Sequence, residues 1–446
     1  MSATDEVKAN EAARNVPAPE VPLTLDEADI AAAAETPTPL ASLWRNRDYM
    51  LLLAGHSVSS LGSRMSGAAF PLLVLALTNN DFAAAGIVGA LFSLPYLLFS
   101  LPAGALIDRW DRKLVMILCD VGRAAAMGSI PLSLLFGGPW LWQLYLVAFV
   151  EGTLFVFFNI AEVAALPRVV AKAQLPTATG FNHAAEASTG LIGPPIGTVL
   201  FVNVGRIFPF LLDAVSYTAS VVSLLFVRTN FKRERAVKER HLGREIKEGV
   251  AWLWSQPLVR FMSLLTGGNN FAFSGLFLVI IARVKELGIP EDQLGIILSI
   301  GAVGGIVGSV VGGKVGKQLK FGPAIITIMW LQTLLLPFYA IAPNLLVLGI
   351  ISALIYMLSP VYNVVQFSYR LALIPDELQG RVNSSFRMIA FGFMPLGQTL
   401  VGFLLVWFST TISVLVLTAW MVVFSLLATV NSHVRNAKPI DQVAGG

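Results

Sequence analysis

Four of the ionisable side chains inside long apolar stretches of this sequence could do chemistry, because a charge there is costly and therefore informative. They are Arg64, Glu151, Glu186 and Asp213. A charged side chain at the centre of a lipid-spanning helix costs at least about 2.5–3.5 kcal/mol in insertion experiments, so each needs a partner or water. Arg64 lies near the middle of its stretch, and we expect Glu151 or Glu186 to pair with it.

The three acids in this set also have the chemistry to carry protons. Proton coupling needs a carboxyl group that is withdrawn from bulk water and can still gain and lose a proton. We predict Glu151 as the first candidate for the proton site and Glu186 as the second, with Asp213 as a further candidate. Asp120 and Arg123 also lie in an apolar stretch, but they are one helical turn apart and we expect them to neutralise each other.

A second set of residues could line a substrate cavity, because aromatic walls with few hydrogen-bonding groups suit a bulky amphiphile. The predicted cavity residues are Arg64, Phe155, Phe158, Asn182, Asn269, Asn270, Tyr356, Asn363, Gln366 and Arg387. Phe155 and Phe158 share a helix face with Glu151. The alternative that such aromatics face lipid or pack as core stays open.

The elements that must position these residues are twelve apolar stretches. The chain is 55% hydrophobic and only 13% charged, so it could not cover the surface of a soluble protein. A helix of about 20 apolar residues spans the bilayer core, and only helices satisfy their own backbone there. The predicted spans, numbered one to twelve, are 49–78, 83–107, 113–135, 141–166, 175–203, 206–228, 258–283, 291–313, 322–342, 344–370, 381–407 and 410–431.

Lysine and arginine accumulate in every second connection, which predicts the orientation of the chain. The alternate connections hold only Arg206, Arg283 and Lys285, whereas the central connection 229–257 is strongly basic. Both termini are therefore expected in the cytoplasm. The formal net charge of +4 reflects this topology and does not indicate a nucleic-acid partner.

The same pattern predicts five segments. They are a disordered, acidic cytoplasmic tail (1–42), a six-helix bundle (43–228), a cytoplasmic linker (229–257), a second six-helix bundle (258–432) and a cytoplasmic tail (433–446). The charged part of the linker, from Phe231 to Glu248, is expected to form a surface helix. The two bundles are weakly similar at a period of about 201 residues, which pairs Asn182 with Asn383, Glu186 with Arg387 and Pro194 with Pro395. Internal symmetry of this kind is typical of secondary transporters.

Two motifs carry a resemblance to a known family. Residues 104–113 read GALIDRWDRK between spans two and three, and residues 190–197 read GLIGPPIG in span five. The first resembles the signature loop of the major facilitator superfamily, and the second resembles its antiporter motif. Together with LWRNRDY at 43–49 and LPRVV at 166–170, they are similar to the subgroup of enterobactin exporters and macrolide efflux pumps.

The resemblance implies an all-α membrane protein with two pseudo-symmetric six-helix bundles, in the cytoplasmic (inner) membrane of a bacterium. It also implies a conformational latch made of Gly104, Asp108, Arg109, Arg112, Lys113 and Glu162, and an antiporter motif made of Gly190, Gly193, Pro194, Pro195 and Gly197. We expect Asp108 to meet the start of span eleven and Arg112 to pair with Glu162. Two departures are clear, because Glu151-Gly152 replaces the family's arginine motif in span four and the second copy of the loop, Gly313 to Lys317, has no acid.

Glycines also form a seam in span eight, which we expect to pack against span five. Its members are Gly301, Gly304, Gly305, Gly308 and Gly312. The prolines Pro194 and Pro195 are expected to kink span five.

The sequence therefore predicts a proton-driven exporter of an amphiphilic small molecule, either a drug, a macrolide-like compound or a siderophore. The alternatives are a nutrient or metabolite importer or facilitator and, far less favoured, a membrane-embedded lipid-modifying enzyme. The four histidines are scattered and lack metal-ligand spacing, and the single Cys119 excludes an intrachain disulfide. No cofactor is expected, and the partners are the substrate, protons and the lipid bilayer, with a monomer as the functional unit.

Overall fold

The computed structural model describes residues 42–107, 109–229, 231, 242–318, 320–375 and 378–437. The chain divides into two compact units, Met1–Arg45 and Asn46–Gly446. In the first unit, the described part contains one 3-10 turn, η2 (Leu43–Arg45). Residues 433–437 of the predicted C-terminal tail are described, whereas the rest of that tail and the predicted N-terminal tail, apart from residue 42, fall outside the described residues. So do residues 232–241 of the basic linker, and the linker helix that is described, α9 (Leu242–Ser255), ends later than the predicted charged stretch.

Twelve candidate membrane spans of 19 to 33 residues occur among the described residues. The first six are α3 (Arg47–Leu77), α4 (Phe82–Ile107), α5 (Arg112–Leu134), α6 (Leu141–Val169), α7 (Leu175–Val199) with the short turns η3 (Lys172–Gln174) and η4 (Leu200–Val204), and α8 (Phe208–Phe226). The second six are α10 (Pro257–Ser274) with α11 (Leu276–Glu286), α12 (Leu294–Gln318) after η5 (Glu291–Gln293), α13 (Phe321–Leu335) with α14 (Phe338–Ile341), α15 (Leu345–Leu373), α16 (Gln379–Gly392) with α17 (Met394–Trp407), and α18 (Thr410–Val430). A final turn, α19 (Ser432–Arg435), follows. The predicted all-α fold with twelve membrane helices is confirmed.

Local sequence signals explain where these helices begin and break. The side chains of Asn46 and Asp111 accept hydrogen bonds from the first backbone amides of α3 and α5, which are the amides that a helix leaves unpaired. Gly275 separates α10 from α11, and Pro337 is the N-cap residue of the short α14. The helix α7 continues through Pro194 and Pro195 and changes to the π-helical turn η4 at Leu200.

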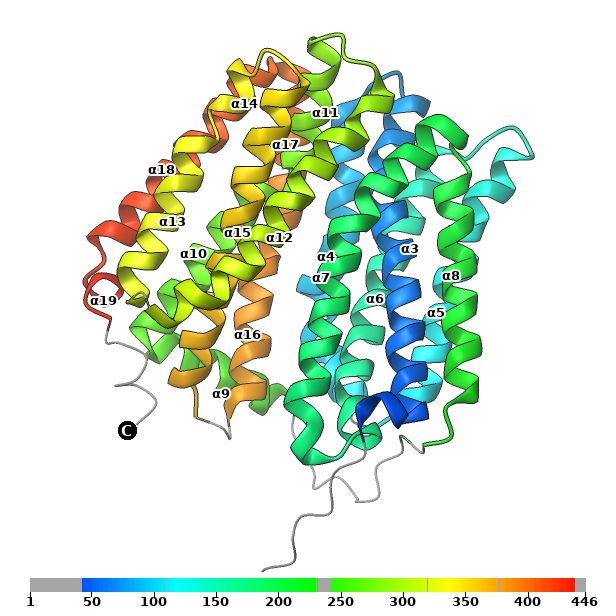
Figure 1. Ribbon diagram of the computed structural model, residues 1–446, viewed down its shortest axis with the longest axis vertical. Helices are drawn as coiled ribbons and strands as arrows, with labels where there is room; N and C mark the ends of the chain where they lie inside the picture. Colours follow the sequence, from blue (N-terminus) through cyan, green and yellow to red (C-terminus); the bar gives the residue numbers. More distant parts are fainter. Residues whose placement is uncertain are drawn as a thin grey trace, which may run out of the picture. The chain divides into compact units, whose positions relative to one another are not determined.

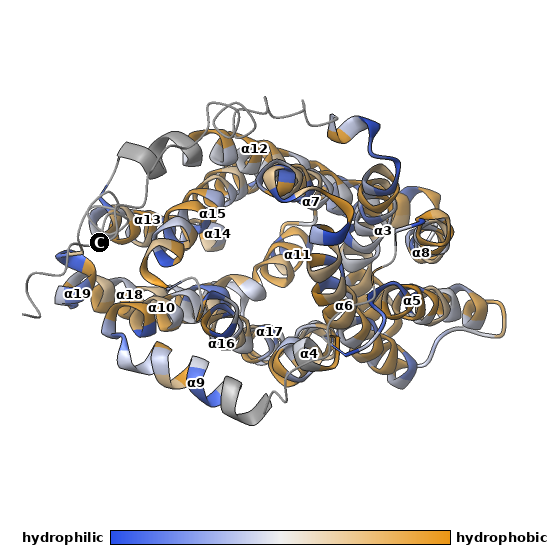
Figure 2. Cartoon of the chain, turned by 90° about the horizontal axis from the view of Figure 1, so that it is seen from below, coloured by the Kyte–Doolittle hydropathy of each residue, from blue (hydrophilic) through white to orange (hydrophobic). Residues whose placement is uncertain are grey.

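Within each half, the helices pack as neighbours around a buried centre. In the first half α3 packs against α7 and α8, α4 against α6, and α5 against α6 and α8. In the second half α12 lies along α15, and α10 contacts α16, α17 and α18. Figure 1 shows these two groups, the first from blue to green and the second from green through yellow to red. Apolar side chains such as Leu118 and Val215 are exposed on the outer faces of α5 and α8, which are largely apolar in Figure 2, so these faces are suited to lipid.

The two halves meet along two seams. One joins α4 to α16 and α17, and the other joins α7 to α12. In the first seam the hydroxyl of Ser93 donates to the side-chain carbonyl of Gln398 at 2.7 Å. Near the ends of the spans, Lys285 Nζ donates to Asn80 Oδ1 at 2.8 Å.

The glycine seam of α12 packs chiefly on α15, so the expectation that it faces span five was wrong for most of its members. A Cβ at Gly304 or Gly308 would lie against the α15 backbone at Ala353 or Met357. Gly305 contacts Leu191 of α7. The reason is geometric, because successive residues of a helix are rotated by about 100° and Gly305 therefore points away from its neighbour Gly304.

Replacement of Gly304 by valine is expected to destabilise the protein by at least about 1–3 kcal/mol, because the added side chain has no space against the α15 backbone. The measurement is thermal unfolding of the detergent-solubilised protein. Gly67→Ala is the matched control, since a Cβ at Gly67 meets nothing within 4 Å and alanine favours the helix by up to about 1 kcal/mol. Equal melting temperatures for Gly304→Val and the wild type would contradict the packing described.

Candidate functional site

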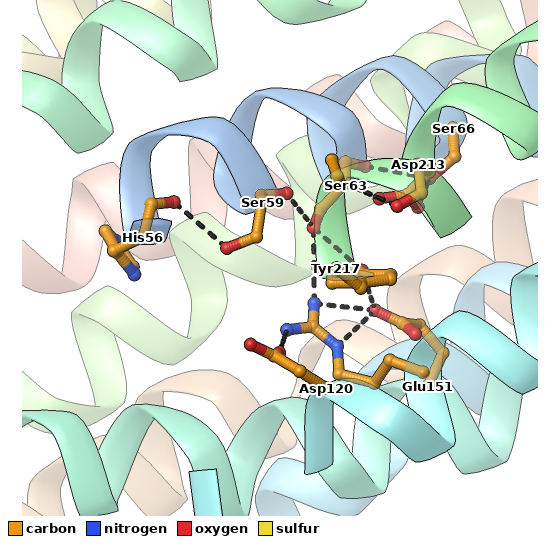
Figure 3. A network of polar contacts seen from close by, with 10 residues as sticks. His56, Ser59, Ser63, Ser66, Asp120, Glu151, Asp213 and Tyr217 are labelled. Carbon is orange, nitrogen blue, oxygen red and sulfur yellow. Dashed lines mark hydrogen bonds and ion pairs between the residues drawn. The ribbon is translucent and has the colours of Figure 1, made fainter. Parts of the chain in front are cut away.

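A buried arginine, Arg123 of α5, is the centre of a polar network between four helices. Figure 3 shows its partners Asp120, Glu151, Ser63 and Tyr217. The Arg123 side chain is 2% exposed. Its Nε and Nη2 lie 2.8 and 2.7 Å from Glu151 Oε1 on α6, whereas Nη1 is 3.5 Å from Asp120 Oδ1. Nη2 also donates to Ser63 Oγ of α3 at 3.2 Å. The predicted Asp120–Arg123 pair is therefore present, but Glu151 is the closer partner.

Tyr217 of α8 completes this arrangement. Its hydroxyl donates to Glu151 Oε1 at 2.6 Å and lies 2.8 Å from Ser63 Oγ. The guanidinium of Arg123 sits over the Tyr217 ring, 4.1 Å from the ring centre. Arg123 and Tyr217 thus place three donors around one oxygen of Glu151, and this stabilises the ionised carboxylate.

Asp213 of α8 lies in a different environment. It is fully buried, and Ser66 Oγ donates to its Oδ2 at 2.5 Å. The hydroxyl of Ser216 is 3.4 Å from its Oδ1. A Cβ at Gly62 would lie against both Ser216 and Asp213, so the glycine allows α3 and α8 to approach closely here. Among the described residues, no lysine, arginine or histidine forms an ion pair with Asp213.

A histidine for which the sequence predicted no role, His56, forms a further contact between α3 and α6. His56 Nδ1 on α3 lies 3.1 Å from Glu162 Oε2 on α6, with both side chains largely buried. The imidazole stacks on Phe158 at a centroid distance of 6.2 Å. The predicted Arg112–Glu162 pair is not among the ion pairs of the described chain, because Glu162 turns toward His56 while Arg112 Nη1 donates to the Ala164 carbonyl at 2.8 Å.

The second charged pair, Arg64 and Glu186, is open to solvent. Arg64 Nη2 on α3 lies 3.4 Å from Glu186 Oε1 on α7, and each side chain is 43% exposed. Of the two partners expected for Arg64, Glu186 is therefore the one with which it pairs. Exposed charges in the middle of membrane spans cannot face lipid, so we infer that this pair faces water between the two halves.

The glycines of the predicted antiporter motif lie directly against α3 beside this pair. A Cβ at Gly193 would lie against Arg64, and one at Gly197 would lie against the Met65 backbone. Gly190 is the loosest of the three, since a Cβ there is 4.0 Å from Arg64 Nε. The motif therefore sets the distance between α7 and the helix that carries Arg64.

An aromatic cluster bridges the two halves nearby. Tyr96 of α4 lies between Phe155 of α6 and Phe391 of α16, with centroid distances of 6.0 and 5.5 Å. The exposed Arg387 sits over Phe391, 5.9 Å from its ring centre. Of the predicted cavity residues, Arg64, Phe155 and Arg387 thus lie in or beside the region where the halves meet.

Other predicted cavity residues have packing roles in this structure. Phe158 is 2% exposed, and Asn270 Nδ2 donates to the Ala390 carbonyl at 2.8 Å, which ties α10 to α16. Tyr356 packs where a Cβ at Gly301 would lie, and Asn182 lies 3.3 Å from the Tyr49 hydroxyl.

Three further predicted cavity residues lie in the second half. Asn363 is exposed, whereas Asn269 and Gln366 are buried and each has one side-chain atom without a hydrogen-bond partner.

The loop of the predicted latch ties helix ends together within the first half. Lys113 Nζ donates to the Val227 carbonyl at 2.7 Å, at the end of α8. Asp111 caps α5. Gly104 has open space around it and Arg109 is exposed, while Asp108 lies outside the described residues. Across the described ranges, no cluster of three or more histidine, cysteine, aspartate or glutamate side chains could hold a metal ion.

Comparison with known proteins agrees with this arrangement. The family model of the Major Facilitator Superfamily matches residues 52–397. The chain belongs to the major facilitator superfamily. It is accordingly a multi-pass membrane transporter and not an enzyme.

Curated relatives of this superfamily member include efflux proteins. The multidrug efflux pump Tap of Mycolicibacterium fortuitum is 25% identical over 370 residues, which cover 79% of this chain and 88% of that protein. Macrolide efflux protein A of Enterococcus faecalis is 27% identical over 176 residues, covering 39% of this chain and 54% of that protein. The resemblance to the macrolide efflux subgroup is thus supported.

Solved structures show the same fold. A nucleoside transporter, NupG, aligns with a TM-score of 0.69 at 12% identity and covers 86% of this chain and 99% of that one. A bacterial homologue of the human lysosomal transporter Spinster, in an inward-facing and unoccupied conformation, gives 0.66 at 13% identity, with coverage of 86% and 97%.

Replacement of Arg123 by glutamine is expected to destabilise the protein by about 3–5 kcal/mol, because it leaves Glu151 buried without its cation. The double substitution Arg123→Gln/Glu151→Gln should lose less than Arg123→Gln alone. Both are compared by thermal unfolding of the purified protein in the same detergent. Losses that simply add would show that the two side chains are not coupled.

Proposed function

We propose that this protein exports amphiphilic small molecules across the bacterial cytoplasmic membrane in exchange for protons. The observation that carries the proposal is an excess of buried acids. Among the described residues of the first half, four carboxyl groups are buried, those of Asp120, Glu151, Glu162 and Asp213, with two buried arginines, Arg112 and Arg123. Arg123 pairs with Asp120 and Glu151. A buried negative charge without compensation is strongly unfavourable, so this group of side chains is suited to hold at least one proton.

Asp213 is the site that this argument favours for the exchanged proton. Glu151 is compensated by Arg123 and Tyr217, whereas Asp213 has only the hydroxyls of Ser66 and Ser216 among its described partners. A neutral carboxyl group suits such a position better than an ion does. The order of the predicted proton sites therefore changes to Asp213 first and Glu151 second, with Glu186 last because it is half-exposed and paired with Arg64.

The helix α3 connects the proposed proton site with the proposed substrate region. Ser63 and Ser66 contact the buried network, while Arg64 faces Glu186 and the space between the halves. Loss of a proton from Asp213 would strengthen its attraction for donors on α3 and shift the helix that holds Arg64. The antiporter glycines on α7 pack on the same stretch of α3, so the shift is transmitted to the seam between α7 and α12.

The region beside Arg64 supports an amphiphilic substrate. Tyr96, Phe155 and Phe391 offer apolar rings, and the Arg64–Glu186 pair offers charge. Sites with aromatic walls and a few polar groups bind bulky amphiphiles. The efflux relatives support export, and the substrate class we propose is a drug, a macrolide-like compound or a siderophore.

The structure resembles a state that is open toward the cytoplasm, if the basic connections lie there as proposed. Contacts between the halves involve the part of α4 that holds Ser93 and the part of α7 that holds Leu191 and Val199, away from the latch loop. Gly104 in that loop has open space around it, which leaves room for a helix of the other half to approach in the alternate state. We propose that the latch residues act at that closure.

Asp213→Asn is expected to abolish proton-driven transport, because the amide cannot take up or release a proton at neutral pH. The assay is accumulation of a labelled macrolide by everted vesicles, with a lumenal dye that reports the pH change. Glu151→Gln should also abolish coupled transport if both acids act in one network, and Asp292→Asn, an exposed acid in the connection before α12, is the matched control.

Full accumulation and full proton movement in Asp213→Asn would remove Asp213 from the mechanism. Accumulation in intact cells that falls when an uncoupler is added would instead indicate an importer.

The proposed orientation predicts opposite labelling of two exposed positions. In a Cys119→Ala background, cysteine at Asn80, before α4, should react with an impermeant maleimide in intact cells. Cysteine at Ser255, at the end of α9, should react only after the membrane is permeabilised, because the linker is expected in the cytoplasm. The reverse labelling pattern would overturn the orientation and with it the proposed direction of transport.

A further inference from the structure

The second half contains a buried cation, Arg370, near the end of α15. The residue is 6% exposed, and its guanidinium stacks on Phe386 of α16 with 3.8 Å to the ring centre. Its Nη1 donates to Gln366 Oε1 at 3.4 Å. In the described part of the chain no carboxylate forms an ion pair with it, and its buried Nε has no hydrogen-bond acceptor.

The side-chain amide nitrogen of the neighbouring Gln366 also lacks a hydrogen-bond partner. Gln366 lies one turn before Arg370 and is 5% exposed. Because its Oε1 accepts from Arg370, the remaining group is the Nε2 amide, and this donor is buried without a partner. Two adjacent buried donors without acceptors cost free energy, and a ligand with strong acceptor oxygens would recover it.

A second arginine lies near this pair. Arg387 of α16 acts electrostatically on Arg370, so the two positive charges repel each other unless an anion lies near them. Arg387 is exposed and sits over Phe391, which contacts Tyr96 of the first half. The basic site therefore adjoins the aromatic cluster between the halves.

The position of Arg370 in the last turn of α15 has a simpler explanation, since a cation there is favoured by the helix dipole. That interaction supplies no hydrogen-bond acceptor to Arg370 Nε or Gln366 Nε2. It also gives no reason for a second arginine nearby, and an anionic ligand explains all three features.

We propose that Arg370, Gln366 and Arg387 bind an oxyanion, a carboxylate or a phosphate, carried by the transported amphiphile. The inference rests on the proposed function for the identity of the cargo, and it narrows the substrate class to molecules with a negatively charged oxygen group beside an apolar body. The anion accepts hydrogen bonds from Arg370 and Gln366, and the apolar body lies toward Phe391 and Tyr96.

The test is equilibrium binding to the purified full-length protein in phosphatidylcholine nanodiscs, followed by fluorescence polarisation. The two probes are a rhodamine with a free carboxylate and the methyl ester of the same dye. The wild type should bind the acid more tightly than the ester. Arg370→Gln should weaken binding of the acid by about tenfold or more and leave binding of the ester unchanged, since only the acid uses the charge. Arg260→Gln, an arginine stacked near Trp254, is the matched control.

Gln366→Glu keeps the experiment decisive if Arg370→Gln fails to fold. The new carboxylate would lie beside Arg370 as an internal counter-ion, so it should raise the melting temperature and abolish the preference for the acid. A merely structural role for these residues predicts no change in that preference. Equal binding of acid and ester by the wild type, or equal loss of both in Arg370→Gln, would overturn the proposal.

Nanodiscs that contain phosphatidylglycerol separate the two sources of an oxyanion. Loss of acid binding in these discs alone would assign the site to a lipid headgroup and overturn its assignment to the cargo. Because binding is measured without a proton gradient, failure of this inference is distinct from failure of proton-driven export.

Discussion

The charge on Arg123 constrains the whole first half of this transporter. A guanidinium that is 2% exposed within a membrane span needs compensation from its surroundings, because lipid offers none. Asp120, Glu151, Ser63 and the ring of Tyr217 provide that compensation, and they come from four different helices. The helices α3, α5, α6 and α8 are therefore held in one register by a single buried cation. Since Arg123 and Tyr217 donate to Glu151, whereas only serine hydroxyls reach Asp213, the same cation also separates the roles of these acids.

The helix α3 is the element where these constraints meet the rest of the molecule. Its opposite sides carry Ser66, which bonds to Asp213, and Arg64, which pairs with Glu186 near the other half. Close approach at Gly193 leaves little room for α3 to shift without α7. Under the proposed proton exchange, a change in protonation at the buried acids would be coupled mechanically to the seam between the halves. We propose that the predicted antiporter motif provides the stiff contact and that the buried network provides the two-state element.

The two halves share a fold but differ in charge. The internal repeat places Arg387 where the first half has Glu186, and the buried ionisable groups follow the same division. Acids exceed bases around Arg123, whereas Arg370 has no acidic partner among the described residues. We therefore propose that the first half binds the proton and the second half binds the anion, so that a proton and an anionic amphiphile would bind to separate bundles. Reorganisation of the seams α4–α17 and α7–α12 would link the two events.

The sequence alone determined the twelve spans and their class, because burial in lipid acts on each helix separately and leaves a local apolar signature. It also identified Glu151, Asp213 and the two family motifs, since a charge in an apolar run or a fixed spacing of glycines is visible without neighbours. Only the tertiary structure decided which charges pair. Arg123 reaches Glu151, His56 reaches Glu162 and the glycines of α12 face α15, and each contact depends on how one helix is rotated against another that is distant in sequence. Helix rotation is fixed by the sum of many weak packing contacts, which a linear pattern of residues does not specify.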